Sequence, residues 1–293
     1  MSAERGIWRG LAVPGVVWLV LFVVVPAYAV LAVAMGKIDT LLQPVPIWNP
    51  LEWNVGFVKE AFQSVFPGGT YWSATRNTVL YVAATVALCF AIGYPVAYYV
   101  ARCAGRTKAL LLVLIFVPFW VSYLMRMLAW IGLLAPDGYV NEVFSWFGLP
   151  QTDWLNGNPF SVIAALTYGY IPYFILPVFA GLDRIDTRLL EASRDLGASR
   201  PWTFLRVTLP LSWPSILAGT VLIVLPMFGD YYTNDLISGS PHTNMLGNSV
   251  NLLVQGGSQK NLGAALVLVL MTILAFGMLY YLWETRRHER KLA

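Results

Sequence analysis

The sequence is poor in charge. Asp, Glu, Lys and Arg make up only 12% of its 293 residues, whereas 58% of the residues are hydrophobic. A soluble globular protein has about 25% charged residues, so this chain lacks the charge needed to cover a water-facing surface. Much of its apolar surface must therefore face lipid. The composition excludes an ordinary soluble protein and indicates an integral membrane protein.

Residues that carry chemistry are also scarce. Cys89 and Cys103 are the two cysteines, and His242 and His288 the two histidines. This is too few for a disulfide framework or a Cys/His metal cluster. The sequence holds no G-x-x-x-x-G-K-[ST] phosphate loop, so any ATP must be bound by another chain. We therefore expect no catalytic residue, no metal and no cofactor on this chain, and a membrane-embedded enzyme is disfavoured.

Six apolar blocks recur along the chain, at roughly 9–36, 77–101, 109–134, 159–181, 205–229 and 262–283. About twenty helical residues cross a ~30 Å hydrocarbon core, and lipid satisfies no backbone hydrogen bond. The alternating polarity of β-barrel strands is missing. The first block is longer than the 7–15 apolar residues of an export signal, so we expect it to be retained as a helix. The sequence predicts an all-α integral membrane protein with six transmembrane helices.

The basic residues are distributed unevenly between the two sides of this predicted topology. With the N-terminus inside, 14 of the 19 basic residues lie in inner segments, and the outer segments hold Lys37, Lys59, Arg76, Arg126 and Lys260. The positive-inside rule then places both termini in the cytoplasm. The sequence pI near 9.0 therefore reflects topology and does not indicate nucleic-acid binding, which would need a basic, water-facing domain.

One charged segment, EASRDLGASRPWTFLRVTLP, lies between two apolar blocks at residues 191–210. We predict a helix from about Thr187 to Leu196, because Gly197 can adopt the left-handed conformation that ends a helix and Pro201 cannot continue one. A helix of ten residues is marginal in isolation, which favours a docking partner.

The spacing of this segment resembles the EAA signature of bacterial ABC importer permeases, E-A-A, x3, G, x9, I-x-L-P. Ser193 stands in place of Ala and Val207 in place of Ile, both conservatively. The resemblance implies a cytoplasmic coupling helix on a type I ABC importer permease (MetI-like) core. The ATPase-coupling residues it implies are Glu191, Ala192, Ser193, Asp195, Gly197, Leu209 and Pro210.

A wider series of segments resembles one branch of these permeases. MRMLAWIGLL, GYVNEVFSWFGL, LPMFGDYYTNDLISG, MLGNSV and LGAAL occur in this order. Together they are similar to the B-type permease subunit of spermidine/putrescine ABC importers of the cell inner membrane. The resemblance implies a second, C-type permease subunit, two copies of an ABC ATPase that carry ATP and Mg, and an extracytoplasmic polyamine-binding protein.

Candidates for the substrate path come from the membrane edge and from aromatic residues. Asp230 and Asp235 bracket Tyr231 and Tyr232 at the outer end of the fifth block. Carboxylates there neutralise an amine and ring faces attract it, although a solvated loop that caps the next helix would have the same composition. Further candidates in the third and fourth blocks are Trp120, Tyr123, Tyr168 and Tyr173.

Three other residues in these blocks need an explanation. Pro172 and Pro177 are expected to break the fourth helix, as happens where backbone lines a permeation path. Arg126 is expected to be structural, either reaching outward to water or pairing with Asp137 or Glu142.

We expect three regions: an N-terminal helix and outer loop at 1–70, an ABC importer transmembrane domain at 71–285 with its coupling helix at about 187–200, and a basic cytoplasmic tail at 286–293. Alternatives are an ABC permease for another small solute, such as an iron complex or an opine, and a stand-alone secondary transporter. The latter should show an inverted repeat or intramembrane relay acids, and neither is clear.

Overall fold

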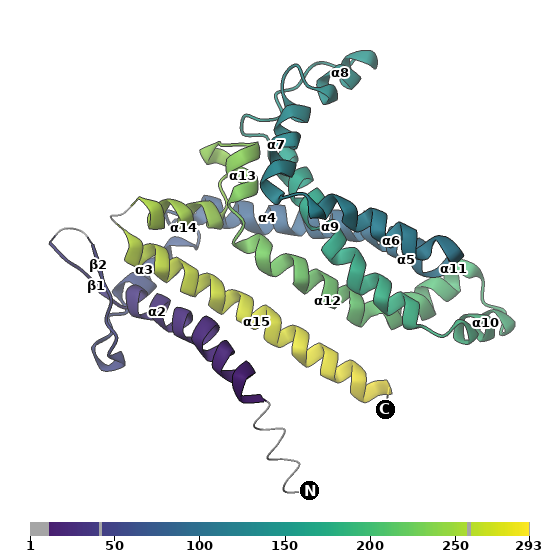
Figure 1. The fold of residues 1–293 in the computed structure, drawn as a ribbon, viewed down its shortest axis with the longest axis horizontal. Helices are drawn as coiled ribbons and strands as arrows, with labels where there is room; N and C mark the ends of the chain where they lie inside the picture. The colour runs from purple at the N-terminus through teal and green to yellow at the C-terminus, as the bar shows by residue number, and fades with distance from the viewer. Residues whose placement is uncertain (1–11, 41–42, 257–258, 293) are drawn as a thin grey trace, which may run out of the picture. The chain divides into compact units, whose positions relative to one another are not determined.

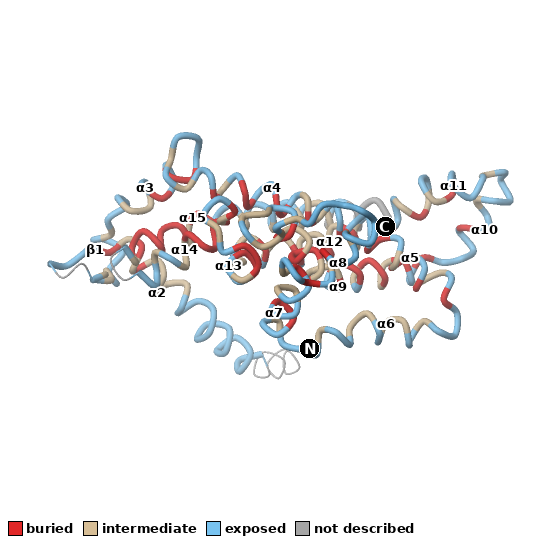
Figure 2. The backbone as a smooth tube through the Cα atoms, turned by 90° about the horizontal axis from the view of Figure 1, so that it is seen from above, coloured by how far each residue is buried: buried red, intermediate tan, exposed pale blue. Residues whose placement is uncertain are grey.

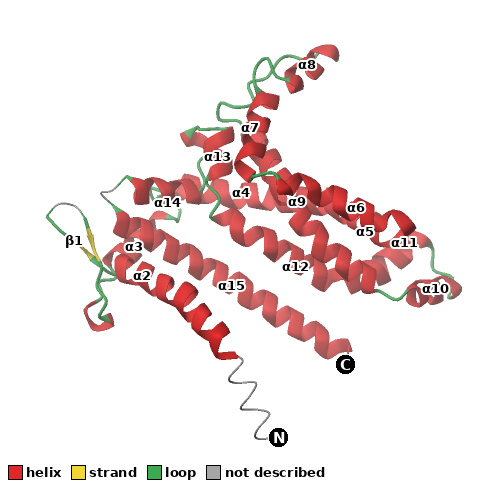
Figure 3. Cartoon of the chain, in the orientation of Figure 1, coloured by secondary structure: helices red, strands yellow, loops and turns green. Residues whose placement is uncertain are grey.

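The computed structural model describes residues 12–40, 43–256 and 259–292 (Figure 1). Helices make up most of the described chain, and its only strands form one short hairpin (Figure 3). The predicted all-α class is confirmed. The chain forms two compact units, residues 1–72 with 249–273, and residues 73–248 with 274–293.

The smaller unit is built on the first membrane helix. This helix covers Ala12–Ala34 and includes the π-turn η1 (Val20–Val24) and α2 (Val25–Ala34). After it come β1 (Lys37–Ile38), β2 (Pro44–Val45), η2 (Pro50–Glu52) and α3 (Gly56–Ser64), with Lys37 opposite Val45 in the hairpin. The Asn261 side-chain amide donates to the Val33 carbonyl at 2.7 Å, which ties the start of α15 (Lys260–Leu292) to the end of α2.

The larger unit holds the remaining elements. In chain order they are α4 (Trp72–Leu88), η3 (Cys89–Gly93), α5 (Tyr94–Arg102), η4 (Gly105–Thr107), α6 (Lys108–Phe116), η5 (Val117–Trp120), α7 (Tyr123–Leu134), α8 (Tyr139–Trp146), α9 (Pro159–Arg184), α10 (Thr187–Asp195), α11 (Arg200–Thr203), η6 (Phe204–Thr208), α12 (Leu209–Phe228), α13 (Tyr232–Ile237), η7 (Pro241–Thr243) and α14 (Leu246–Gln255), which continues into the smaller unit. Helix α9 is central, because it packs along both α12 and α5.

The core of the larger unit lies around α9. Phe174 and Leu182 of α9 and Ile223 of α12 are fully buried there (Figure 2). Many large apolar side chains elsewhere stay exposed, among them Leu114 and Phe276. Such exposure is unfavourable in water but suits helices surrounded by lipid.

Among the described residues, five helices are long and apolar enough to cross a membrane: Ala12–Ala34, Trp72–Arg102, Pro159–Arg184, Arg200–Phe228 and Lys260–Thr285. The predicted span at 109–134 is instead a pair of helices, Gly105–Trp120 and Tyr123–Trp146, bent by 88°. The bend follows the turn that contains Pro118, at Val121 and Ser122, whose ψ angles of 136° and 141° are extended. The six predicted spans therefore correspond to five continuous helices and one broken pair.

The predicted break in the fourth span is wrong. Helix α9 runs for 26 residues from Pro159 to Arg184, with Pro172 and Pro177 inside it. Each proline removes one N–H from the helical ladder, but the packing of α9 against α5 and α12 holds the helix together. The prolines therefore leave the helix continuous and remove the usual donors to the carbonyls of Tyr168 and Tyr173, four residues earlier.

Candidate functional site

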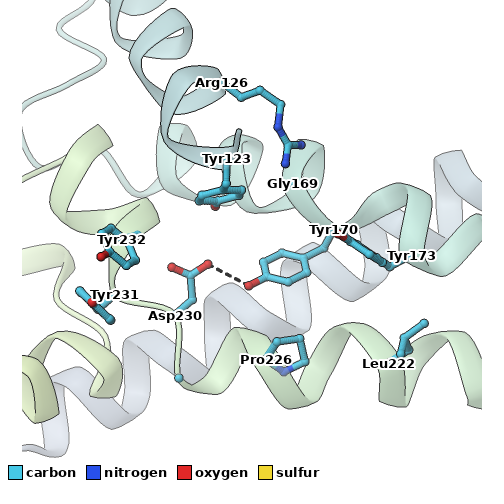
Figure 4. Close-up of a pocket in the computed structure, with 11 residues that line it drawn as sticks. Tyr123, Arg126, Gly169, Tyr170, Tyr173, Leu222, Pro226, Asp230, Tyr231 and Tyr232 are labelled. Atoms are coloured by element: carbon cyan, nitrogen blue, oxygen red, sulfur yellow. Dashed lines mark hydrogen bonds between the residues drawn. The ribbon is translucent and has the colours of Figure 1, made fainter. Parts of the chain in front are cut away.

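A cavity of about 500 Å³ lies in the larger unit (Figure 4). Helices α7, α9 and α12 and the turn into α13 provide its lining, which consists of Tyr123, Arg126, Gly169, Tyr170, Tyr173, Leu222, Pro226, Gly229, Asp230, Tyr231 and Tyr232. The cavity therefore brings together residues from three helices that are far apart in the sequence. One carboxylate, one guanidinium and several tyrosine rings face the same space.

The chain turn after α12 positions Asp230. Helix α12 ends at Phe228, and the N–H groups of Gly229 and Asp230 donate back to Pro226 and Met227. Helix α13 begins two residues later, and the Thr233 N–H donates to Asp230 Oδ1 at 3.0 Å. A side-chain oxygen that accepts a bond from the first turn of a helix is a capping arrangement. The carboxylate is therefore fixed at the junction of the two helices.

Neutral hydroxyl groups complete the surroundings of Asp230. Its Oδ2 accepts from the Tyr170 hydroxyl at 3.0 Å and from Thr233 Oγ1 at 2.8 Å. The Tyr123 hydroxyl contacts Thr233 Oγ1 and donates to it, because the Thr233 proton is directed to Asp230. Among the described residues, no basic side chain forms an ion pair with Asp230. A carboxylate held only by neutral donors keeps its negative charge available to a ligand.

Two tyrosines next to Asp230 form a stacked pair. The ring centroids of Tyr231 and Tyr232 are 4.3 Å apart with an interplanar angle of 28°. The hydrogen bond with Tyr232 raises the pKa of Tyr231 above its usual value, and desolvation and neighbouring acids add to the effect. Tyr231 is therefore uncharged at neutral pH, and the pair offers neutral aromatic faces at the mouth of the cavity.

Arg126 is the second charged group in the lining. Its side chain is buried, with 9% exposure, and its Cζ lies 4.2 Å from the centroid of the Phe119 ring. The expected pairing with Asp137 or Glu142 is wrong, since no ion pair joins these three described residues. Arg126 therefore packs against aromatic rings.

The structure gathers some of the predicted path residues and not others. Tyr123, Tyr173, Asp230, Tyr231 and Tyr232 line the cavity. Asp235, Tyr168 and Trp120 are outside the lining. The Asp235 carboxylate accepts a 2.6 Å bond from Asn248 Nδ2, the Tyr168 ring packs against Phe119 and Trp130, and Trp120 is 82% exposed.

Tyr170 is one of the cavity residues that the sequence argument left out of its candidates. The available signal was its spacing from Tyr173, because residues three apart share one face of a helix. Tyr168 precedes Tyr170 by two residues, a spacing that directs the two side chains to different faces. The three tyrosines therefore could not all face one cavity, and only the packing of α9 decides which of them does.

The predicted coupling segment forms the expected helix. Helix α10 covers Thr187–Asp195, and the Asp186 side chain caps it by accepting from the Arg188 N–H at 2.9 Å. Gly197 has a φ of +87°, so the predicted left-handed end of the helix is confirmed. The Gly197 N–H donates to the Arg194 carbonyl and the Ala198 N–H to the Ser193 carbonyl, which together form a Schellman motif.

The surface of this segment combines charge with apolar residues. Glu191, Ala192 and Asp195 are exposed, and Leu196 is 89% exposed. A cavity of about 530 Å³ lies beside the helix end, lined by Ser193, Leu196, Gly197, Ala198, Ser199, Trp202 and Val207. An exposed leucine beside an apolar cavity is a surface that a partner protein can cover.

A hydrogen bond joins this segment to the start of the next membrane helix. Ser193 Oγ lies 3.1 Å from Thr203 Oγ1 in α11. Leu209 and Pro210 begin α12, where the Leu209 carbonyl accepts from Ser212 Oγ and Leu209 packs on the core.

The model of the family "Binding-protein-dependent transport system inner membrane component" matches residues 93–290. The chain belongs to this family. It is therefore the inner-membrane permease subunit of a binding-protein-dependent importer, and a transport subunit rather than an enzyme. Membership of this family excludes the stand-alone secondary transporter.

Individual relatives agree with this assignment. The chain is 30% identical to the spermidine/putrescine transport system permease protein PotB of Escherichia coli over 275 residues, which cover 92% of this chain and 94% of the relative. It is 28% identical to PotB of Haemophilus influenzae, with 94% and 93% covered. The predicted resemblance to the spermidine/putrescine permeases is confirmed.

Solved structures of ABC importers share the fold of this permease. A bacterial ABC transporter involved in the import of the acidic polysaccharide alginate matches with a TM-score of 0.74, at 16% identity, over 97% of this chain and 96% of the other. The MetNI methionine ABC transporter matches with a TM-score of 0.54, at 18% identity, over 76% and 99%. The predicted ABC importer permease fold is confirmed.

Proposed function

We propose that this permease imports polyamines such as spermidine and putrescine. It forms half of a translocation path whose other half is a second, C-type permease subunit. Two copies of an ABC ATPase carry ATP and Mg, and an extracytoplasmic binding protein delivers the polyamine. The observation that carries the proposal is the Asp230 carboxylate, which faces a tyrosine-lined cavity and forms no ion pair with a basic side chain of the described residues.

The chemistry of the cavity suits an ammonium group. Aliphatic amines have a pKa near 10.4 and are cationic at pH 7. Asp230 supplies the opposite charge, and the Tyr231 and Tyr232 faces attract a cation through their ring quadrupoles. Similarity to PotB of E. coli supports the same cargo, because that protein is named for spermidine and putrescine transport.

Two backbone carbonyls that lack a helical donor are candidates for further acceptors. Pro226 cannot donate the helical hydrogen bond to the carbonyl of Leu222, and Pro177 cannot donate to that of Tyr173. Leu222 and Tyr173 both line the cavity. An ammonium group has three donors, so carbonyls released by proline complement the carboxylate.

The distance between the coupling segment and the cavity suggests how ATP drives transport. Helix α12 begins at Leu209 next to α11 and ends at Phe228 next to Asp230. Twenty helical residues span ~30 Å, so the two sites lie at opposite ends of one helix. In the proposed alternating-access cycle, closure of the ATPases moves α10, and α12 and α9 transmit this motion to the cavity. With both termini in the cytoplasm, α10 faces the ATPases and Asp230 faces the outer side.

The experiment compares Asp230→Asn with Asp235→Asn in ATP-driven uptake of radiolabelled putrescine by the assembled transporter. Asparagine keeps the shape of the side chain, and the Tyr170 and Thr233 hydroxyls can rotate to accept from its amide. A lost hydrogen bond to a charged group is worth about 1.5–3 kcal/mol, so we expect Asp230→Asn to lower uptake efficiency about 10- to 150-fold.

Asp235→Asn is the matched control because Asp235 lies outside the cavity lining and bonds to Asn248. We expect it to change uptake efficiency less than about threefold, a local hydrogen-bond effect. Subunit levels in the membrane are measured for both variants. Unchanged uptake by Asp230→Asn at normal subunit levels would refute the proposed site, and a wild-type transporter that takes up no polyamine would refute the proposed cargo.

A further inference from the structure

Arg126 is held in the structure in an unusual way. Its Cζ lies 4.2 Å from the Phe119 ring centroid, 5.3 Å from that of Tyr123 and 5.8 Å from that of Tyr168. These three rings, from η5, α7 and α9, form an aromatic cage around the guanidinium. Cages of this kind are a means by which proteins recognise cationic groups, including those of ligands.

Within the described chain, hydrogen bonds do not hold Arg126 as they hold most buried arginines. Its Nε and Nη1 atoms are buried and have no hydrogen-bond partner. A buried donor without a partner is costly and needs an explanation. Ring contacts alone impose little directional constraint, and the guanidinium can leave the cage without breaking a hydrogen bond at Nε or Nη1.

The cage adjoins the cavity that contains Asp230: Tyr123 belongs to both, whereas Phe119 and Tyr168 lie outside the cavity lining. Arg126 and Asp230 both line the cavity but do not pair with each other. Tyr123 links the two ends: the guanidinium of Arg126 lies over its ring, and its hydroxyl contacts Thr233, which donates to Asp230. Tyr173 adds a second link, since it lines the cavity and its ring lies 5.7 Å from that of Phe119.

The cavity and the adjoining cage therefore offer two places that favour a positive charge. The first is the Asp230 carboxylate, whose partners are all neutral donors. The second is the aromatic cage, which the chain's own arginine occupies. A linear amine with two ammonium groups matches this arrangement only if its second ammonium replaces Arg126 in the cage, because two cations in one low-dielectric cage repel each other.

We propose that Arg126 is a resident cation that fills the cage of Phe119, Tyr123 and Tyr168 in the empty permease and gives way to the second ammonium group of a linear diamine. Arg126 is thus a specificity-determining residue, and the cage is the subsite for the distal amine. This inference rests on the proposed function, since it assigns the second charge of the proposed polyamine cargo. Exchange of one cation for another keeps the charge of the cage constant as substrate enters.

The test measures binding to the permease–ATPase complex in lipid nanodiscs, without the binding protein and without ATP. Radiolabelled 1,4-diaminobutane gives one Kd, and competition by butylamine, which has the same chain length and one ammonium, gives the other. In Arg126→Gln the cage is free of its resident cation. We expect the Kd for 1,4-diaminobutane to fall about tenfold, which corresponds to a cation–π contact of ordinary strength. The Kd for butylamine should change less than about threefold.

Three further variants separate this role from a structural one. Arg126→Lys keeps a cation in the cage and should retain the wild-type ratio of the two Kd values. Phe119→Leu, placed in the Arg126→Gln background, removes the closest ring and should reverse the gain for the diamine only. Arg206→Gln is the matched control, because Arg206 also lies over a ring, at 5.7 Å from Trp202, but away from the cavity.

The outcomes are distinct. Equal changes of both Kd values in Arg126→Gln would overturn the inference, because general electrostatics would then explain the effect. Weaker diamine binding in Arg126→Gln, restored by Arg126→Lys, would also overturn it and assign Arg126 a structural role. A wild-type complex that binds neither amine would refute the proposed polyamine function itself.

Discussion

Gly197 provides a test of how the coupling helix works, because its φ of +87° is a conformation that residues other than glycine rarely adopt. Apart from its two chain neighbours, a Cβ at this position would meet no atom of the described residues within 4 Å. The cost of a side chain is therefore conformational and not steric. For Ala it is about 1–2 kcal/mol, which lowers the population of the Schellman turn relative to other conformations about 5- to 30-fold.

We expect uptake to fall in a graded series. Asn tolerates the left-handed region best and should lose least, Ala should be intermediate, and the β-branched Val should lose most. Gly197→Pro should abolish uptake, because it also removes the N–H that donates to the Arg194 carbonyl. The assay is ATP-driven uptake into proteoliposomes at matched subunit levels, together with the ATPase rate of the same complexes.

Gly148 is the matched control for this series. It ends α8 with the same motif, at a φ of +70°, and its N–H and that of Leu149 donate to the carbonyls of Ser145 and Phe144. Gly148→Ala carries the same local cost at a helix outside the coupling segment, so uptake should persist. Wild-type uptake by the Val variant of Gly197 would refute the reasoning. Equal loss in Asn and Val would show that a partner surface excludes any side chain there.

Three more predictions concern other parts of the larger unit. Arg102 Nη2 donates to the carbonyls of Leu182 at 2.6 Å and Ile185 at 2.7 Å. Arg102→Met should therefore lower the free energy of unfolding by about 1.5–3 kcal/mol and lower the thermal midpoint of the detergent-solubilised protein. The midpoint of Arg102→Lys should lie between those of the wild type and Arg102→Met. An unchanged midpoint would contradict this. A cysteine at Ser199, with both native cysteines replaced, should react with an impermeant thiol reagent only from the cytoplasmic side, and labelling from outside would overturn the orientation. Asn141 is 1% exposed and accepts two hydrogen bonds from the loop that follows α8. Asn141→Ala should therefore speed protease cleavage of that loop. Equal cleavage rates in the variant and the wild type would show that other contacts hold the loop.

The coupling helix was predictable because the information that specifies it is local. The helix limits, the left-handed Gly197 and the exposed acids Glu191 and Asp195 all follow from neighbouring residues in one segment. Capping and helix termination depend on hydrogen bonds within about five residues, which a sequence shows directly. The membrane spans were predictable for a related reason, because their length and apolarity are properties of continuous stretches.

The substrate cavity was predictable only in part. The turn after α12 supplied Asp230, Tyr231 and Tyr232 as neighbours in sequence, so these were found. Tyr170 and Arg126 come from other helices, and their orientation depends on how α9 is rotated and where the chain bends before α7. No pattern of neighbouring residues encodes this rotation, and Pro118, just before the bend, signals a kink but not its angle.

The sequence by itself therefore determined the class of protein, its helical spans and its coupling segment, because composition, apolar length and capping act over short distances along the chain. Only the tertiary structure decided that Asp230 and Arg126 share one cavity, that α9 stays continuous through Pro172 and Pro177, and that Asp235 lies outside the cavity lining. The physical reason is that a cavity is the space left between packed helices. Its lining depends on the relative rotation of helices that are far apart in the chain.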